Sequence, residues 1–300
     1  MQTVGVIGGG QLAWMMAAGA QRLDVDLAIQ AEKSIDPAVA IAQHVVYGAV
    51  DDATVTAQLA QRAQTITFEN EFIDLDALAP LEQAGTVFCP SLSALRPLLD
   101  KYDQRCYLRD AGLPTPQFAA LPENPTETDL LQFGLPVVVK ARRQGYDGYG
   151  TIIVRDRPQI EPTLNRIQQS STEWMLEAFV PFERELAIMV ARSASGEMTT
   201  YPVVETQQIQ QICRRVLALN DIPLAVRQQA DTIAKTLLTA LDFVGIMGIE
   251  FFLTSDGLLV NETAPRTHNS GHYSLDACPT SQFEQQLRAV TGQPLGDARL

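Results

Sequence analysis

The chain has 300 residues, of which 46% are hydrophobic and 19% charged, and it carries a formal net charge of −13. This length accommodates two domains with full cores, and the composition is that of a globular rather than a disordered chain. The acidic balance excludes nonspecific binding of nucleic acids or anionic membranes, because both need a basic surface. Local phosphate binding stays open, since backbone N–H groups and a few placed cations suffice for it.

Neither membrane insertion nor export is expected from this sequence. No apolar run approaches the roughly 18 residues of a membrane span, and no basic leader precedes the apolar N-terminal stretch. The four cysteines are widely spaced and form no C-x-x-C pair: Cys89, Cys106, Cys213 and Cys278. Such spacing is typical of reduced thiols in a cytoplasmic protein, and we expect them to be buried rather than reactive.

Strands and helices alternate in the first hundred residues. The predicted elements are strands at 3–7, 27–30 and 65–69, and helices that end near residue 23 and span 53–62. This order is typical of a parallel, doubly wound α/β sheet. We therefore predict an N-terminal domain at residues 1–98.

Residues 99–300 show a different, α+β pattern. A helical pattern at 100–111 precedes a proline-rich segment at 114–125, which marks a plausible boundary within the chain. The elements predicted after it are strands at 136–140, 151–154, 174–179 and 186–191, and a helix at 224–241. We interpret residues 99–300 as one domain of this mixed class.

The first glycine-rich turn fits a dinucleotide-binding fingerprint. Gly8-x-Gly10-x-x-Ala13 follows a predicted strand and precedes a helix, and Glu32 lies 19 residues beyond Ala13. In that pattern the acid binds a ribose hydroxyl, which favours a nicotinamide-dependent oxidoreductase. The turn itself indicates only that a phosphate-sized anion can approach a bare helix N-terminus. A tight strand-to-helix turn that needs small residues explains the same glycines.

A second glycine-rich loop follows an apolar strand that ends in Lys140. Its residues, 145–151, include three glycines, which let backbone N–H groups approach phosphates, and Lys140 offers a point charge to them. No Gly-Lys-Ser/Thr closes the loop, so it is not a Walker A loop. A simple hairpin turn accounts for the glycines but not for Lys140. Farther along, Glu177 and Glu185 suit binding of a base and a ribose, or belong to a solvated acidic loop.

Two apolar runs joined by Ser-Asp-Gly predict a β-hairpin at 250–262. A loop centred on Asp256 places Glu250 directly opposite Glu262. Facing carboxylates repel each other unless something neutralises them, and Mg²⁺, held by one or two carboxylates and by substrate phosphates, does so. The alternative is a register shifted by one residue, with one glutamate facing solvent.

Taken together, these segments resemble the N5-carboxyaminoimidazole ribonucleotide synthetase (PurK) family of ATP-grasp enzymes, from the first strand to about Pro294. The resemblance is carried by Gly10-Gln11-Leu12, Lys140, Gly145-Tyr146-Asp147-Gly148-x-Gly150, Glu177 with Glu185, Glu250, and Asn261-Glu262-x-Ala264-Pro265-Arg266-x-His268-Asn269-Ser270-Gly271-His272. The last motif is highly specific for the family, whereas the glycine loops are not. The resemblance implies a Rossmann-like, pre-ATP-grasp N-terminal domain followed by a two-lobed ATP-grasp domain.

The activity implied by the resemblance is that of an ATP-dependent carboxylating ligase of purine biosynthesis. ATP and bicarbonate form carboxyphosphate, whose carboxyl group passes to the N5 amine of 5-aminoimidazole ribonucleotide. The expected partners are these small molecules, with Mg²⁺ as cofactor. The resemblance also implies a possible homodimer.

The resemblance assigns a role to each matching position. The ATP contacts it implies are Lys101, Lys140, Gly145, Tyr146, Asp147, Gly148, Tyr149, Gly150, Thr151, Glu177, Ala178, Phe179, Val180, Glu185, Gln208, Asn261 and Glu262. The implied Mg²⁺ ligands are Glu250 and Glu262. The ribonucleotide contacts it implies are Gly10, Gln11, Leu12, Tyr146, Arg266, His268, Asn269, Ser270, Gly271 and His272. The implied catalytic residues are Asp147, Arg266 and His272, with Asp147 and His272 as candidates for handling the amine proton. His44 lies outside the motif and is expected to be structural or at the surface.

Three departures from the family pattern are present. Tyr149 stands where a basic residue is usual, Thr151 where Gln is usual, and Gln208 where His is usual. We expect Arg142 or Arg143 to supply the missing charge. Family members also continue past Leu300 with a small β-rich domain, which we expect this chain to lack. An ATP-binding protein without turnover is therefore an alternative function.

Overall fold

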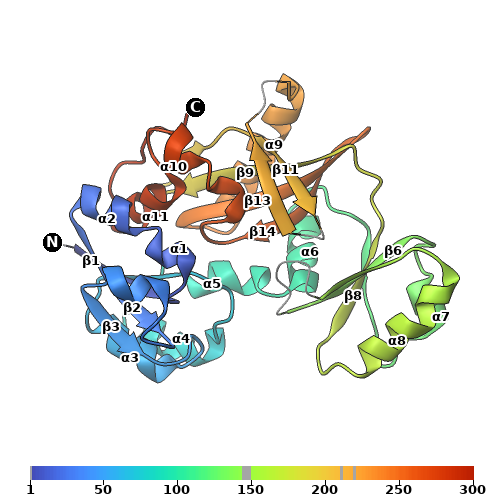
Figure 1. Cartoon of the computed structure of the whole chain (residues 1–300), viewed down its shortest axis with the longest axis horizontal. Coiled ribbons are helices and arrows are strands. Elements are labelled where there is room, and N and C mark those ends of the chain that lie inside the picture. The colour runs from blue at the N-terminus through green and yellow to red at the C-terminus, as the bar shows by residue number, and fades with distance from the viewer. Residues whose placement is uncertain (1, 144–149, 210–211, 219–220) are drawn as a thin grey trace.

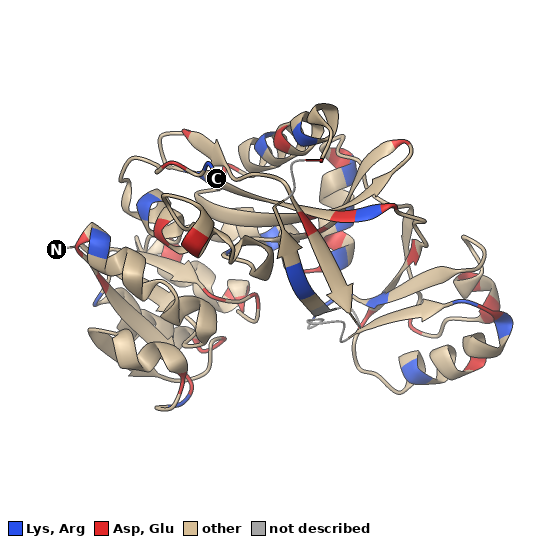
Figure 2. Cartoon of the chain, turned by 45° about the horizontal axis from the view of Figure 1, so that its top comes forward, with Lys and Arg blue, Asp and Glu red and all other residues tan. Residues whose placement is uncertain are grey.

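The computed structural model of the chain describes residues 2–143, 150–209, 212–218 and 221–300. The described residues form three sheets, which Figure 1 shows as an N-terminal sheet at one end, a central sheet, and a separate lobe at the other end. Acidic and basic residues are interspersed over the whole molecule (Figure 2). None of the described helices is both long and apolar enough to cross a membrane.

The N-terminal sheet is parallel and has the strand order β3-β2-β1-β4. Its strands are β1 (Gln2–Ile7), β2 (Val25–Ala31), β3 (His44–Tyr47) and β4 (Thr65–Phe68). The helices around it are α1 (Gln11–Trp14), α2 (Ala17–Leu23), η1 (Pro37–Ile41), α3 (Ala53–Ala60), α4 (Leu75–Gln83) and α5 (Leu92–Leu95). The predicted doubly wound sheet is confirmed, although the single helix expected up to residue 23 is two short helices.

The two faces of this sheet are covered by different parts of the chain. One face packs against residues of α3, α4 and α5. The other packs against α1 and α2 and, from the far end of the sequence, against α11 (Gln282–Thr291). Phe283 and Leu287 of α11 are fully buried in one core with Val4 and Val6. The last helix therefore belongs to the N-terminal core, while the predicted boundary between residues 98 and 99 stays a prediction.

The central sheet is antiparallel, with the order β12-β11-β9-β13-β14 and β10 paired to β9. Its strands are β9 (Arg184–Arg192), β10 (Met198–Thr200), β11 (Val204–Ile209), β12 (Ile212–Leu217), β13 (Gly245–Thr254) and β14 (Gly257–Ala264). Helices α6 (Lys101–Asp110) and α9 (Leu224–Ala240) share its largest apolar core. The Asp100 side chain caps α6 by accepting from the Tyr102 and Asp103 N–H groups.

The remaining lobe contains an antiparallel sheet of order β5-β8-β6-β7. Its elements are β5 (Phe118–Ala120), α7 (Glu127–Leu130), β6 (Val137–Ala141), β7 (Thr151–Val154), η3 (Arg157–Gln159), α8 (Ile160–Gln168) and β8 (Trp174–Ala178). A turn, η4 (Asn269–Gly271), and helix α10 (Ser274–Ala277) connect the central sheet to α11. The strands predicted at 136–140, 151–154, 174–179 and 186–191 are present, and the structure shows that they pair antiparallel.

Candidate active site

The hairpin of β13 and β14 places Glu250 opposite Glu262, as predicted. The predicted loop centre is wrong, however, because the strands are joined by two residues, and Phe251 pairs with Val260. One extra residue, Asn261, then bulges from β14 and shifts the register back by one position. Without this bulge Glu250 would face Asn261. Bulges re-aim side chains beside active sites, and this one sets the carboxylate pair.

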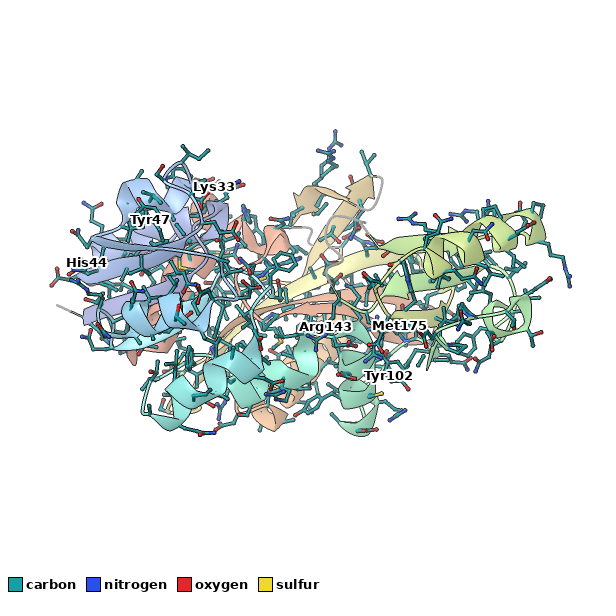
Figure 3. The ribbon with its side chains drawn as sticks, turned by 90° about the horizontal axis from the view of Figure 1, so that it is seen from below. Lys33, His44, Tyr47, Tyr102, Arg143 and Met175 are labelled. Atoms are coloured by element: carbon teal, nitrogen blue, oxygen red, sulfur yellow. The ribbon has the colours of Figure 1, made fainter. Side chains whose placement is uncertain are left out.

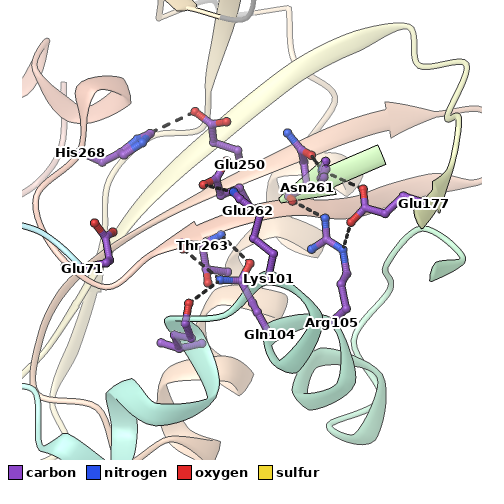
Figure 4. A network of polar contacts seen from close by, with 12 residues as sticks. Glu71, Lys101, Gln104, Arg105, Glu177, Glu250, Asn261, Glu262, Thr263 and His268 are labelled. Atoms are coloured by element: carbon purple, nitrogen blue, oxygen red, sulfur yellow. Dashed lines mark hydrogen bonds and ion pairs between the residues drawn. The ribbon is translucent and has the colours of Figure 1, made fainter. Parts of the chain in front are cut away.

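The two facing carboxylates lie in unlike electrostatic surroundings (Figure 4). Burial, together with the nearby charge of Glu262, raises the pKa of Glu250 to about 8. Burial acts on Glu262 in the same direction, but Lys101 Nζ lies 2.8 Å from its Oε1 and lowers its pKa to about 2. Across β9, burial raises the pKa of Glu185 to about 7. These acids share one face of the sheet, because Glu250 pairs with Ala187, two residues from Glu185.

Behind this pair lies a buried ring of polar groups. The Glu177 carboxylate is 2.6 Å from Arg105 Nε and 2.7 Å from Lys140 Nζ. Arg105 also donates to the backbone oxygen of the bulged Asn261, and Lys140 Nζ lies 3.4 Å from the Asn261 side-chain oxygen. Burial would raise the pKa of Glu177, yet the two cations hold it at about 2. The ring joins α6, β6, β8 and β14, so it ties the separate lobe to the central sheet.

Arg105 is a site residue that the sequence reasoning missed. It lies one helical turn after Lys101 on α6, and its side chain is only 3% exposed. That i, i+4 spacing puts both cations on one helix face, which is the signal that was available. Glu177 was expected to frame a base, but its carboxylate faces the Arg105 and Lys140 cations. Ala178, Phe179 and Val180 follow it, partly exposed, at and beyond the end of β8.

The second glycine loop lies largely outside the described residues. This applies to Gly145, Tyr146, Asp147, Gly148 and Tyr149, so their predicted roles stay predictions.

The described flanks of the second glycine loop are Arg142–Arg143 before it and Gly150–Thr151 after it. Thr151 pairs with Lys140 across β6 and β7. Arg142 was expected to replace a missing charge, but it is bound to Asp100 at 3.0 Å and also contacts Asp103 and Glu173. That expectation is wrong for Arg142, which holds the root of the loop against α6.

Around the loop root, Figure 3 groups Arg143 with Tyr102 and Met175, and it places His44, Lys33 and Tyr47 at the far end of the molecule. Arg143 is 62% exposed, with one long contact to Asp100. His44 is exposed on β3, which agrees with its expected place outside the site.

Gln208 lies on β11, where it pairs with Cys213 of β12. Glu250 and Glu185 are close enough to Cys213 to raise its pKa, after burial, to about 11. Gln208 is therefore near the acidic face of the central sheet. The cysteines are free and partly buried.

The first glycine turn is occupied by a side chain of the protein itself. Glu69, at the end of β4, accepts hydrogen bonds from the backbone N–H groups of Gly10 at 2.6 Å, Leu12 at 3.0 Å and Ala13 at 3.4 Å. A Cβ atom at Gly10 would lie 2.4 Å from the Glu69 carboxylate, so this contact explains the glycine. Glu69 thus occupies the helix N-terminus where the dinucleotide interpretation places a pyrophosphate.

Glu69 was also missed, although the signal was present. β1 and β4 are parallel neighbours, so Glu69 and the glycine turn lie at the same edge of the sheet. Glu32, the acid that the dinucleotide fingerprint singled out, is exposed. The predicted ribonucleotide contacts at Gly10 and Leu12 therefore start from N–H groups that already have a carboxylate partner.

The segment 266–272 folds as a compact turn beside the glutamate pair. Arg266 binds Glu71, with its Nη2 2.9 Å from the carboxylate. His268 Nδ1 lies 3.9 Å from Glu250 Oε1 and 2.8 Å from Ser270 Oγ. Burial, with Arg266 nearby, lowers the pKa of His268 to about 4, so this imidazole is neutral. The structure thus brings the predicted histidine motif and the predicted metal pair together.

Comparisons with known proteins identify the class of enzyme. The ATP-grasp domain family matches residues 106–283, and the ribonucleotide synthetase preATP-grasp domain family matches residues 1–96.

Individual relatives agree with these domain matches. The N5-carboxyaminoimidazole ribonucleotide synthase of Synechococcus elongatus is 54% identical over 301 residues, covering 100% of this chain and 76% of that protein. A structure of the Aspergillus clavatus synthase with ATP has a TM-score of 0.93 at 32% identity and covers 100% of this chain and 79% of that one. A structure of N5-carboxyaminoimidazole synthase from Aspergillus clavatus with ADP and 5-aminoimidazole ribonucleotide has a TM-score of 0.89 at 31% identity, with the same coverage.

These matches define an ATP-grasp enzyme preceded by a preATP-grasp domain, as the fold and the lysine-and-glutamate site indicate. The chain belongs to the N5-carboxyaminoimidazole ribonucleotide synthase family. The predicted fold class, the predicted ATP-dependent ligase and the predicted reaction are thereby confirmed. Neither the oxidoreductase nor the ATP-binding protein without turnover is favoured.

Proposed function

We infer that this chain carboxylates 5-aminoimidazole ribonucleotide in purine biosynthesis, with ATP and bicarbonate as co-substrates. The observation that carries this function is the pair of facing carboxylates, Glu250 and Glu262, set between two lysines and the histidine turn. Phosphoryl transfer needs positioned cations where charge spreads over oxygen atoms, and Lys101 and Lys140 are placed for this.

We propose that Glu250 and Glu262 hold Mg²⁺. Within the described ranges no group of three or more His, Cys, Asp and Glu side chains is arranged to hold a metal. Mg²⁺ commonly takes only one or two carboxylates and completes its shell with substrate phosphates and water. Burial and the charge of Glu262 raise the pKa of Glu250, and a bound cation would offset both. The bound metal would neutralise the phosphate oxygens of ATP.

The remaining assignments divide the site into two halves. We place the nucleotide against the phosphate-side lysines, Glu177 to Val180, Glu185 and Gln208, and the ribonucleotide against Arg266 and residues 268–272. The turn lies beside Glu250, so the two ligands would meet at the metal pair. Cytoplasmic location, predicted from the cysteine spacing, and a homodimer, predicted from the family resemblance, remain predictions, and sedimentation measurements test the second.

The function is tested by ADP release with Mg-ATP and bicarbonate, with and without 5-aminoimidazole ribonucleotide. We expect ribonucleotide-stimulated release by the wild type and a loss of roughly a thousandfold in Glu262→Gln, because removing one charged group at such a site costs this much. Asp256→Asn, at the exposed tip of the same hairpin, is the matched control and should retain wild-type rates. No stimulation in the wild type would contradict the function, and normal turnover of Glu262→Gln would contradict the metal site.

A further inference from the structure

Helix α11 carries buried glutamines at three positions that face different parts of the molecule. Gln282, Gln285 and Gln286 are at most 1% exposed. A buried amide is costly unless its donor and acceptor are both paired. Gln286 accepts from the Ile246 N–H and donates to Thr67 Oγ, and Gln285 accepts from and donates to the backbone of Gly296. These four bonds hold structural segments together, whereas Gln282 binds the histidine turn.

Gln282 forms two hydrogen bonds with the backbone of His268. Its Oε1 accepts from the His268 N–H at 2.9 Å, and its Nε2 donates to the His268 carbonyl oxygen at 2.8 Å. Because a backbone N–H can only donate, the amide oxygen must face it, and the orientation of the amide is fixed. The Gln282 Nε2 group therefore points toward the carbonyl oxygen of His268.

The same carbonyl oxygen determines where the proton sits on His272. His272 Nδ1 lies 3.0 Å from the His268 oxygen, which can only accept, and 3.3 Å from Gln282 Nε2, which can only donate. To bond the oxygen, Nδ1 must carry a proton, whereas to bond the amide it must offer a lone pair. A single ring nitrogen cannot do both. Gln282 already has the oxygen as acceptor, and a carbonyl oxygen has two lone pairs. Both groups therefore donate to it, and neutral His272 has its proton on Nδ1.

His268 has the opposite arrangement. The Ser270 N–H lies 3.4 Å from His268 Nδ1 and can only donate, so Nδ1 is the acceptor and the proton of the neutral ring is on Nε2. His272 is additionally held by Phe283, whose ring meets it edge to face with centroids 5.6 Å apart. The two histidines of the turn thus differ in which nitrogen offers a lone pair.

We propose that Gln282 is a positioning residue for the ribonucleotide half of the site. By holding the His268 backbone it keeps His272 in the Nδ1–H tautomer, so that Nε2 of His272 is the hydrogen-bond acceptor for the ribonucleotide. The proposal rests on the function proposed above, in which residues 268–272 contact the ribonucleotide. Helix α11 then supports two parts of the ribonucleotide half. Gln282 holds the histidine turn, and Phe283 packs in one core with Ala13, next to the first glycine turn.

Gln285 provides a matched control on the same helix. It is equally buried and forms the same pair of backbone bonds, but with Gly296 rather than with the histidine turn. We expect Gln282→Met to lower kcat/KM for the ribonucleotide by about tenfold to a hundredfold, the usual effect of a small misplacement of a binding group. The KM for ATP should change by less than about twofold. Gln285→Met should leave both parameters near wild type; equal losses in the two variants would overturn the proposal.

The tautomers are read from the wild-type protein, and histidine variants serve only to assign the signals. The chain has three histidines, His44, His268 and His272, so the imidazole nitrogens of ¹⁵N-histidine-labelled protein are resolvable by NMR. We expect Nδ1–H on His272 and Nε2–H on His268, with the signals assigned by their separate loss in His44→Gln and His268→Gln. Nε2–H on His272 would overturn the proposal. This measurement needs no turnover, so a protein without ribonucleotide-stimulated activity but with the expected tautomers would contradict the proposed function alone.

Discussion

The two halves of the site are held in place by different chemistry. On the nucleotide side, Lys101 is paired with the partly exposed Glu262 carboxylate, and Arg105 and Lys140 are paired with the buried Glu177 carboxylate. On the other side, Arg266 at the start of the histidine turn pairs with Glu71, but residues 268–272 are held chiefly by neutral bonds, above all those of Gln282 to the His268 backbone. Cations suit a site that receives a polyanion, because they pair with its negative oxygens. Removing one partner of a buried ion pair is costly, so these cations are also firmly held. Neutral bonds instead fix orientation, including the proton position on an imidazole.

The largest expected effect is on the charged half. Arg105→Met leaves Glu177 with one cation and the Asn261 oxygen without its donor, so it should lower the free energy of unfolding by about 3–5 kcal/mol. Urea unfolding monitored by circular dichroism measures this. Arg109→Met on the same helix is the control, since Arg109 is 58% exposed and solvent screens its ion pair with Asp110. Equal destabilisation by both variants would show that the buried ring has no special role.

A smaller loss of stability is expected at the first glycine turn, where the Glu69 carboxylate binds the N–H groups of a helix N-terminus. Glu69→Gln keeps one acceptor oxygen for three backbone donors, so we expect about 1–3 kcal/mol of lost stability. Glu32→Gln, on the same domain and exposed, should have no measurable effect. A dinucleotide-binding turn would give the reverse result, with Glu32 important for ligand binding and Glu69 dispensable.

The smallest expected effect is a pH dependence that belongs to the charged half. Glu250 has a pKa of about 8 when folded, above the ordinary 4.5, so the folded state retains a proton that the unfolded state releases. This stability is fully present below about pH 4.5 and is lost as the pH rises through about 8. Without metal, we expect wild-type stability to fall by about 1 kcal/mol between about pH 6 and 7 relative to Glu250→Gln.

Urea unfolding of both proteins at the two pH values tests this difference, and Mg²⁺ with nucleotide should reduce it by replacing the proton. The same pH slope in wild type and variant would mean that Glu250 is not the titrating group. Glu262 cannot produce it, because its pKa of about 2 places its own loss of stability at acid pH.

The sequence predicted the local features of this site and missed those that depend on distant contacts. The hairpin pairing of Glu250 with Glu262 was predicted correctly, but two deviations, a shorter loop and the bulge at Asn261, cancel each other. The alternation of apolar residues along a hairpin does not indicate a β-bulge, so the bulge at Asn261, directly before Glu262, could not be predicted. The pairing was right because both deviations shift the register by one position in opposite directions.

Local patterns could place Arg105 on the helix face of Lys101 and Glu69 at the edge of the glycine turn, but they could not name the partners of either residue. Arg105 meets Glu177 across 72 residues, and Glu69 meets Gly10 across 59. Their roles follow from how α6 and β4 are oriented against other elements, and orientation is set by the packed core rather than by the residues themselves. The glycine turn was recognised as an anion-binding element, and the anion proved to be a carboxylate of the same chain.

The position of α11 has a consequence for the order in which the protein folds. Residues 2–68 build the N-terminal sheet, yet one of its faces is completed by residues 282–291. During synthesis the first strands leave the ribosome before this helix is made, so Val4 and Val6 lack Phe283 and Leu287 as packing partners until residues 282–291 emerge. The N-terminal sheet can therefore complete its packing only after the central sheet and the separate lobe have been synthesised.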